Sequence, residues 1–354
     1  MHKKISFFNH KGGVSKTTTT FNIGWMLAEK GYKVVMVDAD PQCNLTGLVM
    51  GYKGASELET FYKSETERNL RAGLAPAFES RPKLIEGVEC VAVSSRPGLY
   101  LLPGHIRLAE YEVTLGIAQE LSSSIETLQN LPGSIAFLLD KTAKKFKADY
   151  VLIDMSPSLS SINKNLVMIS DYFILPTSPD YFSVMAIDSL TTILPKWASW
   201  SKTAQNLQIL QEASYPFPTT VPKFLGVVIQ NYRPSKGAPA VAFQQWIDEI
   251  KTIVSDKFVP ALTNCNMMLP PSSYTDRNLS LDYCLTTIRD FNSLIAKSQK
   301  HQTPVFALTD AQIGQRGHLL TKSKESRDEF KNSFSDLADK VVELTTNAES
   351  DRSV

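Results

Sequence analysis

Residues 9–18 of the chain read NHKGGVSKTT, and this stretch decides the fold. The apolar run Ile5–Phe8 before it predicts a buried strand, and the pattern over Lys16–Lys30 after it predicts a helix. A glycine-containing turn between a strand and a helix is the arrangement that a phosphate-binding loop needs. Gly12 and Gly13 let the backbone curl so that N–H groups point at phosphate oxygens, and the following helix adds the partial positive charge of its N-terminus.

The side chains of this loop fit nucleotide chemistry. Lys16 is placed to reach the β- and γ-phosphates, and the Thr17 hydroxyl is placed to bind Mg²⁺. The loop departs from the ordinary G-x-x-x-x-G-K-[ST] pattern, because His10 and Ser15 occupy the two glycine positions. It also carries an additional lysine, Lys11, just before the glycine pair. These features resemble the deviant Walker A motif, K-G-G-x-x-K-[ST], of the ParA/MinD family of ATPases. A strand-to-helix turn with incidental lysines is the alternative.

The resemblance implies ATP and Mg²⁺ as cofactors, ATP hydrolysis as the activity and a homodimer in the ATP-bound state. It implies that Lys11 contacts the phosphates of the second subunit, because two stacked triphosphates repel unless positive charge lies between them. Lys11 and Lys16 are therefore expected to act in catalysis. The residues of the loop that we expect to bind the nucleotide are Lys11, Gly12, Gly13, Val14, Ser15, Lys16, Thr17 and Thr18.

Two aspartates follow the next apolar run. Residues 34–42 read VVMVDADPQ, which places Asp38 and Asp40 at the carboxyl end of a buried strand. In an open α/β sheet this edge is where ligands bind. The segment resembles the D-x-D-P-Q switch of the ParA family. That resemblance implies that Asp40 is a catalytic residue that orients the hydrolytic water, and that Asp38 supports the surroundings of the metal ion. Two solvated loop aspartates are the alternative.

A third aspartate ends a later strand. Residues 151–158 read VLIDMSPS, and the segment resembles a Walker B motif in which Asp154 holds the Mg²⁺ shell through water. The predicted metal site therefore comprises Thr17, Asp38 and Asp154. The family usually shows D-x-P-P here, and Ser156 stands where the first proline is expected. An ordinary aspartate at a strand end is the alternative.

Further segments extend the resemblance along the chain. Residues 99–109 are similar to the LLPG…LA element of the family, and residues 176–183 to the segment after its next strand. Residues 226–232 are similar to the strand and loop that flank the adenine base, so the resemblance runs from residue 4 to about residue 344. In the last of these segments, the resemblance implies that Asn231 flanks the adenine base.

Short apolar runs that alternate with helical patterns predict an α/β fold, an open and mostly parallel twisted sheet with helices on both faces. Strands are expected at Ile5–Phe8, Val34–Val37, Tyr150–Ile153, Tyr172–Leu175 and Phe224–Ile229. Helices are expected at Lys16–Lys30, Ser183–Trp197, Val241–Val254 and Glu325–Leu344. We expect one domain over residues 1–354, with insertions within 53–98 and 198–300 and a polar tail at 347–354.

The composition narrows the class of protein. The net charge of the 354 residues is +1, which excludes a protein that coats polyanions over its whole surface. The four cysteines include no CxxC pair, so we expect neither a metal framework nor a disulfide framework. The sequence has no run of 18 apolar residues and no signal peptide. We therefore expect a cytoplasmic protein.

A basic cluster near the C-terminus suggests a partner. Its members are Arg316, His318, Lys322, Lys324, Arg327 and Lys331. ParA-like ATPases bind DNA without sequence preference through C-terminal basic residues. The resemblance thus implies a nucleoid-associated switch that positions plasmid, chromosome or other cargo, with a ParB-like or other adaptor protein as a partner. For the cluster itself, a merely solvated surface is the alternative.

Other branches of the family fit less well. MinD-like members bind membranes through a C-terminal amphipathic helix with a basic face, whereas residues 328–344 hold five acidic residues and two lysines. We therefore expect no membrane binding. Iron-protein relatives need cluster-ligating cysteines, which have no matching motif here. Ligase relatives lack the close match to Lys11 and the Asp-Pro-Gln segment. The alternative function is a switch ATPase, MinD-like or regulated by a protein partner, that does not bind DNA.

Overall fold

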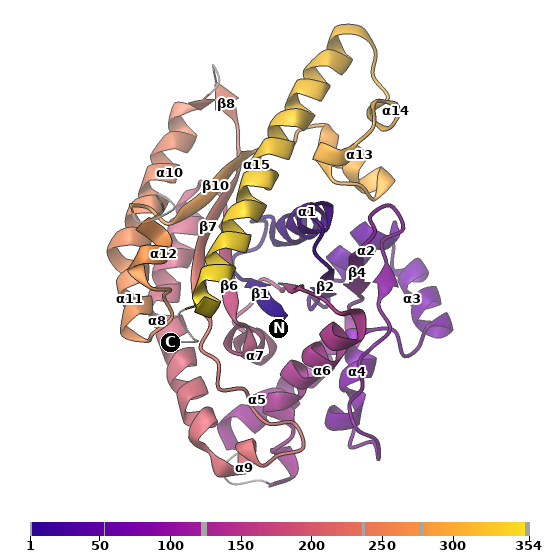
Figure 1. The fold of residues 1–354 in the computed structure, drawn as a ribbon, viewed down its shortest axis with the longest axis vertical. Helices are drawn as coiled ribbons and strands as arrows, with labels where there is room; N and C mark the ends of the chain where they lie inside the picture. The colour runs from indigo at the N-terminus through magenta and orange to yellow at the C-terminus, as the bar shows by residue number, and fades with distance from the viewer. Residues whose placement is uncertain are drawn as a thin grey trace.

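The computed structural model describes residues 2–52, 54–121, 126–235, 238–275, 279 and 281–350. These residues form an eight-stranded central sheet with the strand order β10-β7-β6-β1-β5-β2-β4-β3 (Figure 1). Neighbouring strands are parallel except β3 and β4, which run antiparallel. A second, two-stranded sheet consists of β8 and β9. The predicted α/β fold with an open, mostly parallel sheet is confirmed.

The bounds of the elements follow in chain order. The strands are β1 (Lys3–Phe7), β2 (Val34–Asp38), β3 (Val91–Ala92), β4 (Leu99–Leu102), β5 (Tyr150–Asp154), β6 (Tyr172–Thr177), β7 (Lys223–Tyr232), β8 (Pro234–Ser235), β9 (Ala238–Pro239) and β10 (Cys284–Arg289). The α-helices are α1 (Lys16–Glu29), α2 (Asn44–Met50), α3 (Ala55–Ser64), α4 (Leu70–Phe78), α5 (Tyr111–Leu121), α6 (Leu131–Phe146), α7 (Ser161–Ile169), α8 (Tyr181–Asn206), α9 (Gln208–Gln211), α10 (Val241–Ile253), α11 (Val259–Asn264), α12 (Pro271–Thr275), α13 (Leu294–His301), α14 (Asp310–Ile313) and α15 (Gly317–Ser350). Short 3-10 or π turns are η1 (Ile106–Glu110), η2 (Glu126–Leu128), η3 (Val254–Phe258) and η4 (Val305–Ala307).

Two hydrophobic cores cover the two faces of the sheet, because successive strand residues point to opposite faces. Val35 and Val37 of β2 belong to the core that packs against α4 to α8, α10 and α11. Val34 and Met36 belong to the core that packs against α1 and α15. Every residue of β2, β5 and β6 is buried, as the continuous apolar runs predict for strands covered on both faces.

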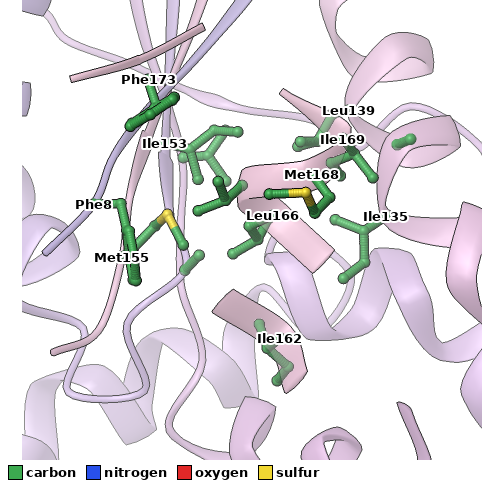
Figure 2. Packing of buried hydrophobic residues seen from close by; sticks show 14 of the residues in the cluster. Phe8, Ile135, Leu139, Ile153, Met155, Ile162, Leu166, Met168, Ile169 and Phe173 are labelled. Atoms are coloured by element: carbon green, nitrogen blue, oxygen red, sulfur yellow. The ribbon is translucent and has the colours of Figure 1, made fainter. Parts of the chain in front are cut away.

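Figure 2 shows the first of these cores close to the carboxyl ends of β1 and β5. Side chains from the sheet and its loops meet side chains from α6 and α7 there: Phe8, Ile153, Met155 and Phe173 on one side, and Ile135, Leu139, Ile162, Leu166 and Ile169 on the other. All of them are buried. This close packing gives the loops that leave β1 and β5 a rigid support.

The register of the sheet brings the sequence motifs together. Phe7 of β1 lies opposite Asp154 of β5, and Asp154 lies opposite Asp38 of β2. The loops that follow these three strands therefore leave the sheet at the same, carboxyl-terminal edge. This is the edge where open α/β sheets bind ligands.

The five predicted strands and four predicted helices are all present, but some elements are longer than predicted and others were not predicted. β10 lies in a region for which the sequence predicts no element, and its register on β7 is irregular. α8 continues through Pro195 to Asn206, and the buried Trp197, Ser201 and Ala204 after the proline keep it packed. α15 begins at Gly317 rather than Glu325, because residues 317–324 are largely exposed and so show no apolar stripe.

The two regions with predicted insertions differ in what they contribute. Region 53–98 holds the short helices α3 and α4 and the edge strand β3. Region 198–300 contributes β7 and β10, which belong to the main sheet. Of the predicted tail at 347–354, α15 includes residues up to Ser350, and 351–354 lie outside the described residues.

Candidate functional site

The predicted phosphate loop joins β1 to α1 through two left-handed residues. Gly13 has φ 73° and Ser15 has φ 61°, and α1 begins directly afterwards at Lys16. Val14 between them is buried and anchors the turn. Gly12 and Gly13 are exposed at the surface of the loop. This geometry presents the unpaired N–H groups at the start of a helix toward the carboxyl edge of the sheet, which suits an anionic ligand.

Lys16 lies under this loop. Its Nζ donates to the carbonyl oxygens of Asn9 at 2.9 Å and Lys11 at 3.0 Å. Burial lowers the pKa of Lys16 to about 8, and the carboxylates of Asp154 and Asp40 oppose that shift. The side chain is therefore a buried cation between the loop and two acidic residues, close to where a phosphate-bearing ligand would enter.

Asp154 is the most unusual polar group of the site. Its side chain is fully buried, and within the described residues neither carboxylate oxygen has a hydrogen-bond partner. Burial, followed by the charge of Asp38, raises the pKa of Asp154 well above the ordinary value. The nearby Thr17 hydroxyl and the positive charge of Lys16 oppose this rise. A buried carboxylate without donors is costly unless a cation satisfies it. Asp154 and the Thr17 hydroxyl therefore fit a Mg²⁺ ion and its water shell, since this ion prefers oxygen ligands.

Asp38 has a different environment. One carboxylate oxygen accepts hydrogen bonds from the N–H of Thr46 at 2.7 Å and from its hydroxyl at 2.6 Å, and the other accepts the N–H of Asp40 at 3.2 Å. The Thr46 hydroxyl also accepts the N–H of Gly104 at 2.9 Å. Burial raises the pKa of Asp38 to about 7. The carboxylate thus ties β2 to α2 and to the loop after β4, which favours a supporting role over direct metal ligation.

Asp40 lies at the wall of a large cleft. Its carboxylate accepts the N–H of Gln42 at 2.9 Å, which closes a tight turn after β2, and only 6% of the residue is exposed. The cleft measures about 1320 Å³ and is lined by Gly12 to Thr18, by Asp40 to Asn44, by Met155 and Pro157, and by α13 residues such as Lys300. Sites for small ligands commonly measure about 300–1,000 Å³. The cleft therefore has room for a nucleotide and more.

Lys11 has partners within its own chain. Its Nζ forms an ion pair with Asp180 and donates to the Ser183 hydroxyl at 2.9 Å. Asp180 is also the N-cap of α8, since its carboxylate accepts the N–H of Ser183 at 3.0 Å. No sequence pattern indicates this partner, because Lys11 and Asp180 are far apart in the chain.

Asn231 lies against the phosphate loop. Its Nδ2 donates to the Ser15 hydroxyl at 2.9 Å, so its amide is engaged with the loop rather than directed only toward a base. The adjacent Gln230 contacts the Thr19 hydroxyl on α1.

Asn9 is a further residue of the site that was not predicted from the sequence. Its side chain accepts the N–H of Lys11 at 2.9 Å and donates to the carbonyl oxygen of Pro176 on β6. Its position two residues after β1 and two residues before Lys11 could have marked it as part of the loop.

The loop after Asp154 is held by side chains in place of the missing proline. The hydroxyl groups of Ser156 and Ser158 form a hydrogen bond of 2.9 Å. The buried Asn163 on α7 donates to the carbonyl oxygens of Ser156 at 2.9 Å and Ser158 at 2.8 Å. Pro157 between the serines lines the cleft opposite Gly12. Asn163 was not a sequence candidate, because nothing in its local pattern marks a loop clamp.

The C-terminal basic cluster divides into two groups. Lys324 and Arg327 pair with Asp310 at the start of α14, at 3.0 and 3.1 Å, and Lys331 pairs with Glu29 of α1 at 3.0 Å. These three residues hold α15 against its neighbours. The other three, Arg316, His318 and Lys322, are exposed on or just before the first turns of α15. Within the described residues, no helix is long and apolar enough to cross a lipid bilayer.

Comparison with known proteins shows where this arrangement recurs. A family model described as an AAA domain matches residues 2–209. The chromosome partitioning protein ParA of Caulobacter vibrioides is 29% identical over 191 residues, which are 54% of this chain and 60% of that protein. This chain belongs to the ParA/MinD family. Its phosphate loop is the deviant Walker A loop of that family of P-loop NTPases.

A further relative is an uncharacterised protein of Methanocaldococcus jannaschii, 31% identical over 185 residues, which are 52% of this chain and 61% of that protein. The chain thus spans about three fifths of the length of these curated relatives. Among solved structures, pNOB8 ParA bound to nonspecific DNA has a TM-score of 0.56 at 20% identity and covers 98% of this chain and 99% of its own. An ATP complex of a Cyanothece McdA variant has a TM-score of 0.53 at 14% identity, with 94% and 96% covered. These two structures share the ParA/MinD fold with this chain.

Proposed function

We propose that this chain is an ATPase that dimerises when it binds ATP and releases its partner after hydrolysis. The observation that carries the proposal is Asp154, a buried carboxylate without donors at the level of the phosphate loop and close to Lys16. That charge pattern suits a magnesium nucleotide. The McdA structure with bound ATP supports the choice of nucleotide, since the two proteins share a fold.

Each residue of the site has a role in this proposal. Bound Mg²⁺ would neutralise phosphate charge and polarise the transferred phosphoryl group. Thr17 would bind the metal directly, and Asp154 would hold its water shell. Lys16 would exchange the carbonyl oxygens that it now contacts for phosphate oxygens. Asp40, at the wall of the cleft, would orient the attacking water.

Exposed apolar side chains support dimerisation across the cleft. Six large ones follow the carboxyl ends of β4 to β7, the edge that carries the nucleotide site: Ile106, Leu159, Tyr181, Phe182, Met185 and Val241. Phe182 is 70% exposed and Val241 is 89% exposed. Exposed apolar groups that follow four strands at one edge of the sheet favour a protein interface. A second copy related by a two-fold axis would cover both faces with the same residues and enclose both nucleotides.

Lys11→Ala is expected to abolish ATP-induced dimerisation. Lys11 pairs with Asp180 in its own chain, so in the proposed dimer it would exchange this partner for the phosphates of the other subunit. Without that charge, two triphosphates would face each other with less compensation. Light scattering with Mg·ATP should give twice the monomer mass for the wild type and the monomer mass for Lys11→Ala. The matched control is Lys202→Ala, an exposed lysine on α8, which should dimerise like the wild type. Full dimerisation of Lys11→Ala would rule out the role in trans.

We further propose that the ATP-bound dimer binds duplex DNA without sequence preference, positions cargo on the nucleoid and is regulated by a ParB-like or other adaptor protein. The structure of pNOB8 ParA with nonspecific DNA supports this choice. Arg316, His318 and Lys322 are the exposed part of the basic cluster, and a dimer would present them twice.

The double variant Arg316→Ala, Lys322→Ala is expected to weaken DNA binding about tenfold and to flatten its salt dependence, because fewer counterions are released on binding. The control Lys196→Ala, Lys202→Ala removes the same charge from exposed positions of α8 and should bind like the wild type. Fluorescence anisotropy on two unrelated duplexes at two salt concentrations, with ATP, measures the effect. If the wild type binds neither duplex at low salt, the chain is better described as a switch regulated by a protein partner.

A further inference from the structure

The phosphate loop contains a serine at a position that requires a left-handed backbone. Ser15 has φ 61° and ψ 31° and is the N-cap of α1. Residues with a Cβ atom disfavour this region, and the ordinary motif has a glycine here. Other contacts must therefore hold Ser15 in the conformation that the loop needs.

Two adjacent residues at the end of β7 supply such contacts. Asn231 donates its Nδ2 to the Ser15 hydroxyl at 2.9 Å. Gln230, which is fully buried, contacts the Thr19 hydroxyl. Thr19 in turn donates its backbone N–H at 2.8 Å and its hydroxyl at 2.7 Å to the carbonyl oxygen of Ser15. The hydroxyl of Ser15 is thus bound directly by a residue of β7, and its carbonyl oxygen is connected to β7 through Thr19.

We infer that Asn231 is a positioning residue for the phosphate loop. It acts through the Ser15 hydroxyl to hold the left-handed turn, so that the amides that follow Ser15 stay directed at the phosphates of the bound nucleotide. The moiety recognised through this contact is the triphosphate, not the base. This inference rests on the proposed nucleotide binding and replaces the expectation that Asn231 flanks adenine.

The conformations of the two residues determine the variants that test this role. Asn231 is itself left-handed, with φ 66°, so Asn231→Gly removes the amide without adding backbone strain, whereas alanine would add it. Ser15→Gly removes the need for a clamp, because glycine adopts this conformation readily. Ser15→Ala removes the hydroxyl but keeps the unfavourable backbone. The probes are a non-hydrolysable ATP analogue and inorganic tripolyphosphate, which has no base, titrated by calorimetry.

In the natural Ser15 chain, we expect Asn231→Gly to weaken the affinity for both probes about three- to tenfold, the effect of losing one hydrogen bond. In the Ser15→Gly background, the same substitution should change either affinity by less than about twofold, because the two sites then no longer interact. Ser15→Ala should bind both probes more weakly than Ser15→Gly, and it gives the same test if Asn231→Gly does not fold.

Two outcomes would overturn the inference. One is an equal loss from Asn231→Gly in the natural chain and in the Ser15→Gly background. The other is a loss for the ATP analogue without any loss for tripolyphosphate, which would show direct contact with the base. Failure of the proposed function is distinguishable from both, because the wild type would then bind neither probe or Lys16→Ala would bind them as tightly as the wild type does.

Discussion

Lys16→Ala is expected to lower the affinity for Mg·ATP by about one to two orders of magnitude. The side chain is a buried cation below the loop, and hydrogen bonds from a charged donor contribute about 1.5–3 kcal/mol. Its Nζ lies within 3.0 Å of two loop carbonyl oxygens, so the charge is already held where phosphates would bind. Calorimetric titration with a non-hydrolysable ATP analogue measures the loss.

Thr17→Ala is the companion variant for this experiment. This variant should bind the ATP analogue more weakly than the wild type only when Mg²⁺ is present. The substitution removes a metal ligand and leaves the phosphate contacts of the loop intact. Thermal unfolding of each variant shows whether the fold is retained. A folded Lys16→Ala variant with the affinity of the wild type would show that this loop is not the phosphate site.

Asp40→Ala is expected to slow ATP hydrolysis about a hundredfold or more while it retains ATP binding. The carboxylate lies at the wall of the cleft, where it accepts the N–H of Gln42, so its loss should affect the attacking water more than the phosphates. Because assembly precedes hydrolysis, this variant should accumulate as the ATP-bound dimer. Phosphate release and light scattering on the same sample measure both effects.

Asp38→Ala is the contrasting control. It removes the acceptor for the N–H and the hydroxyl of Thr46, so it should lower the free energy of unfolding by about 1–3 kcal/mol. If a folded Asp38→Ala variant loses turnover and Asp40→Ala turns over normally, the two carboxylates have the opposite roles.

Local sequence was enough to predict the centre of the fold. The strand before Asn9 and the strands that end at Asp38 and Asp154 are continuous apolar runs, and such runs in an α/β pattern place their ends at one sheet edge. The positions of Lys16 and Thr17 follow from the loop, because one motif carries both residues. These features depend on neighbours in the sequence, so a single sequence reveals them.

Contacts between distant segments could not be predicted in the same way. Ser15 and Asn231 are 216 residues apart, and Lys11 and Asp180 are 169 apart. No local pattern distinguishes an asparagine that holds a loop from one that contacts a base. Nor does the sequence show that Arg327 of the basic cluster pairs with Asp310, because both residues are consistent with a solvated surface. Only the folded chain separates these roles.

In the proposed mechanism, ATP binding drives dimerisation, and hydrolysis takes place only in the dimer. The most direct test is the steady-state rate of phosphate release per chain, measured across a wide range of protein concentrations at saturating Mg·ATP. We expect this rate to rise with protein concentration and to level off once all chains are paired. A rate per chain that does not change with concentration, or no phosphate release at any concentration, would contradict the account.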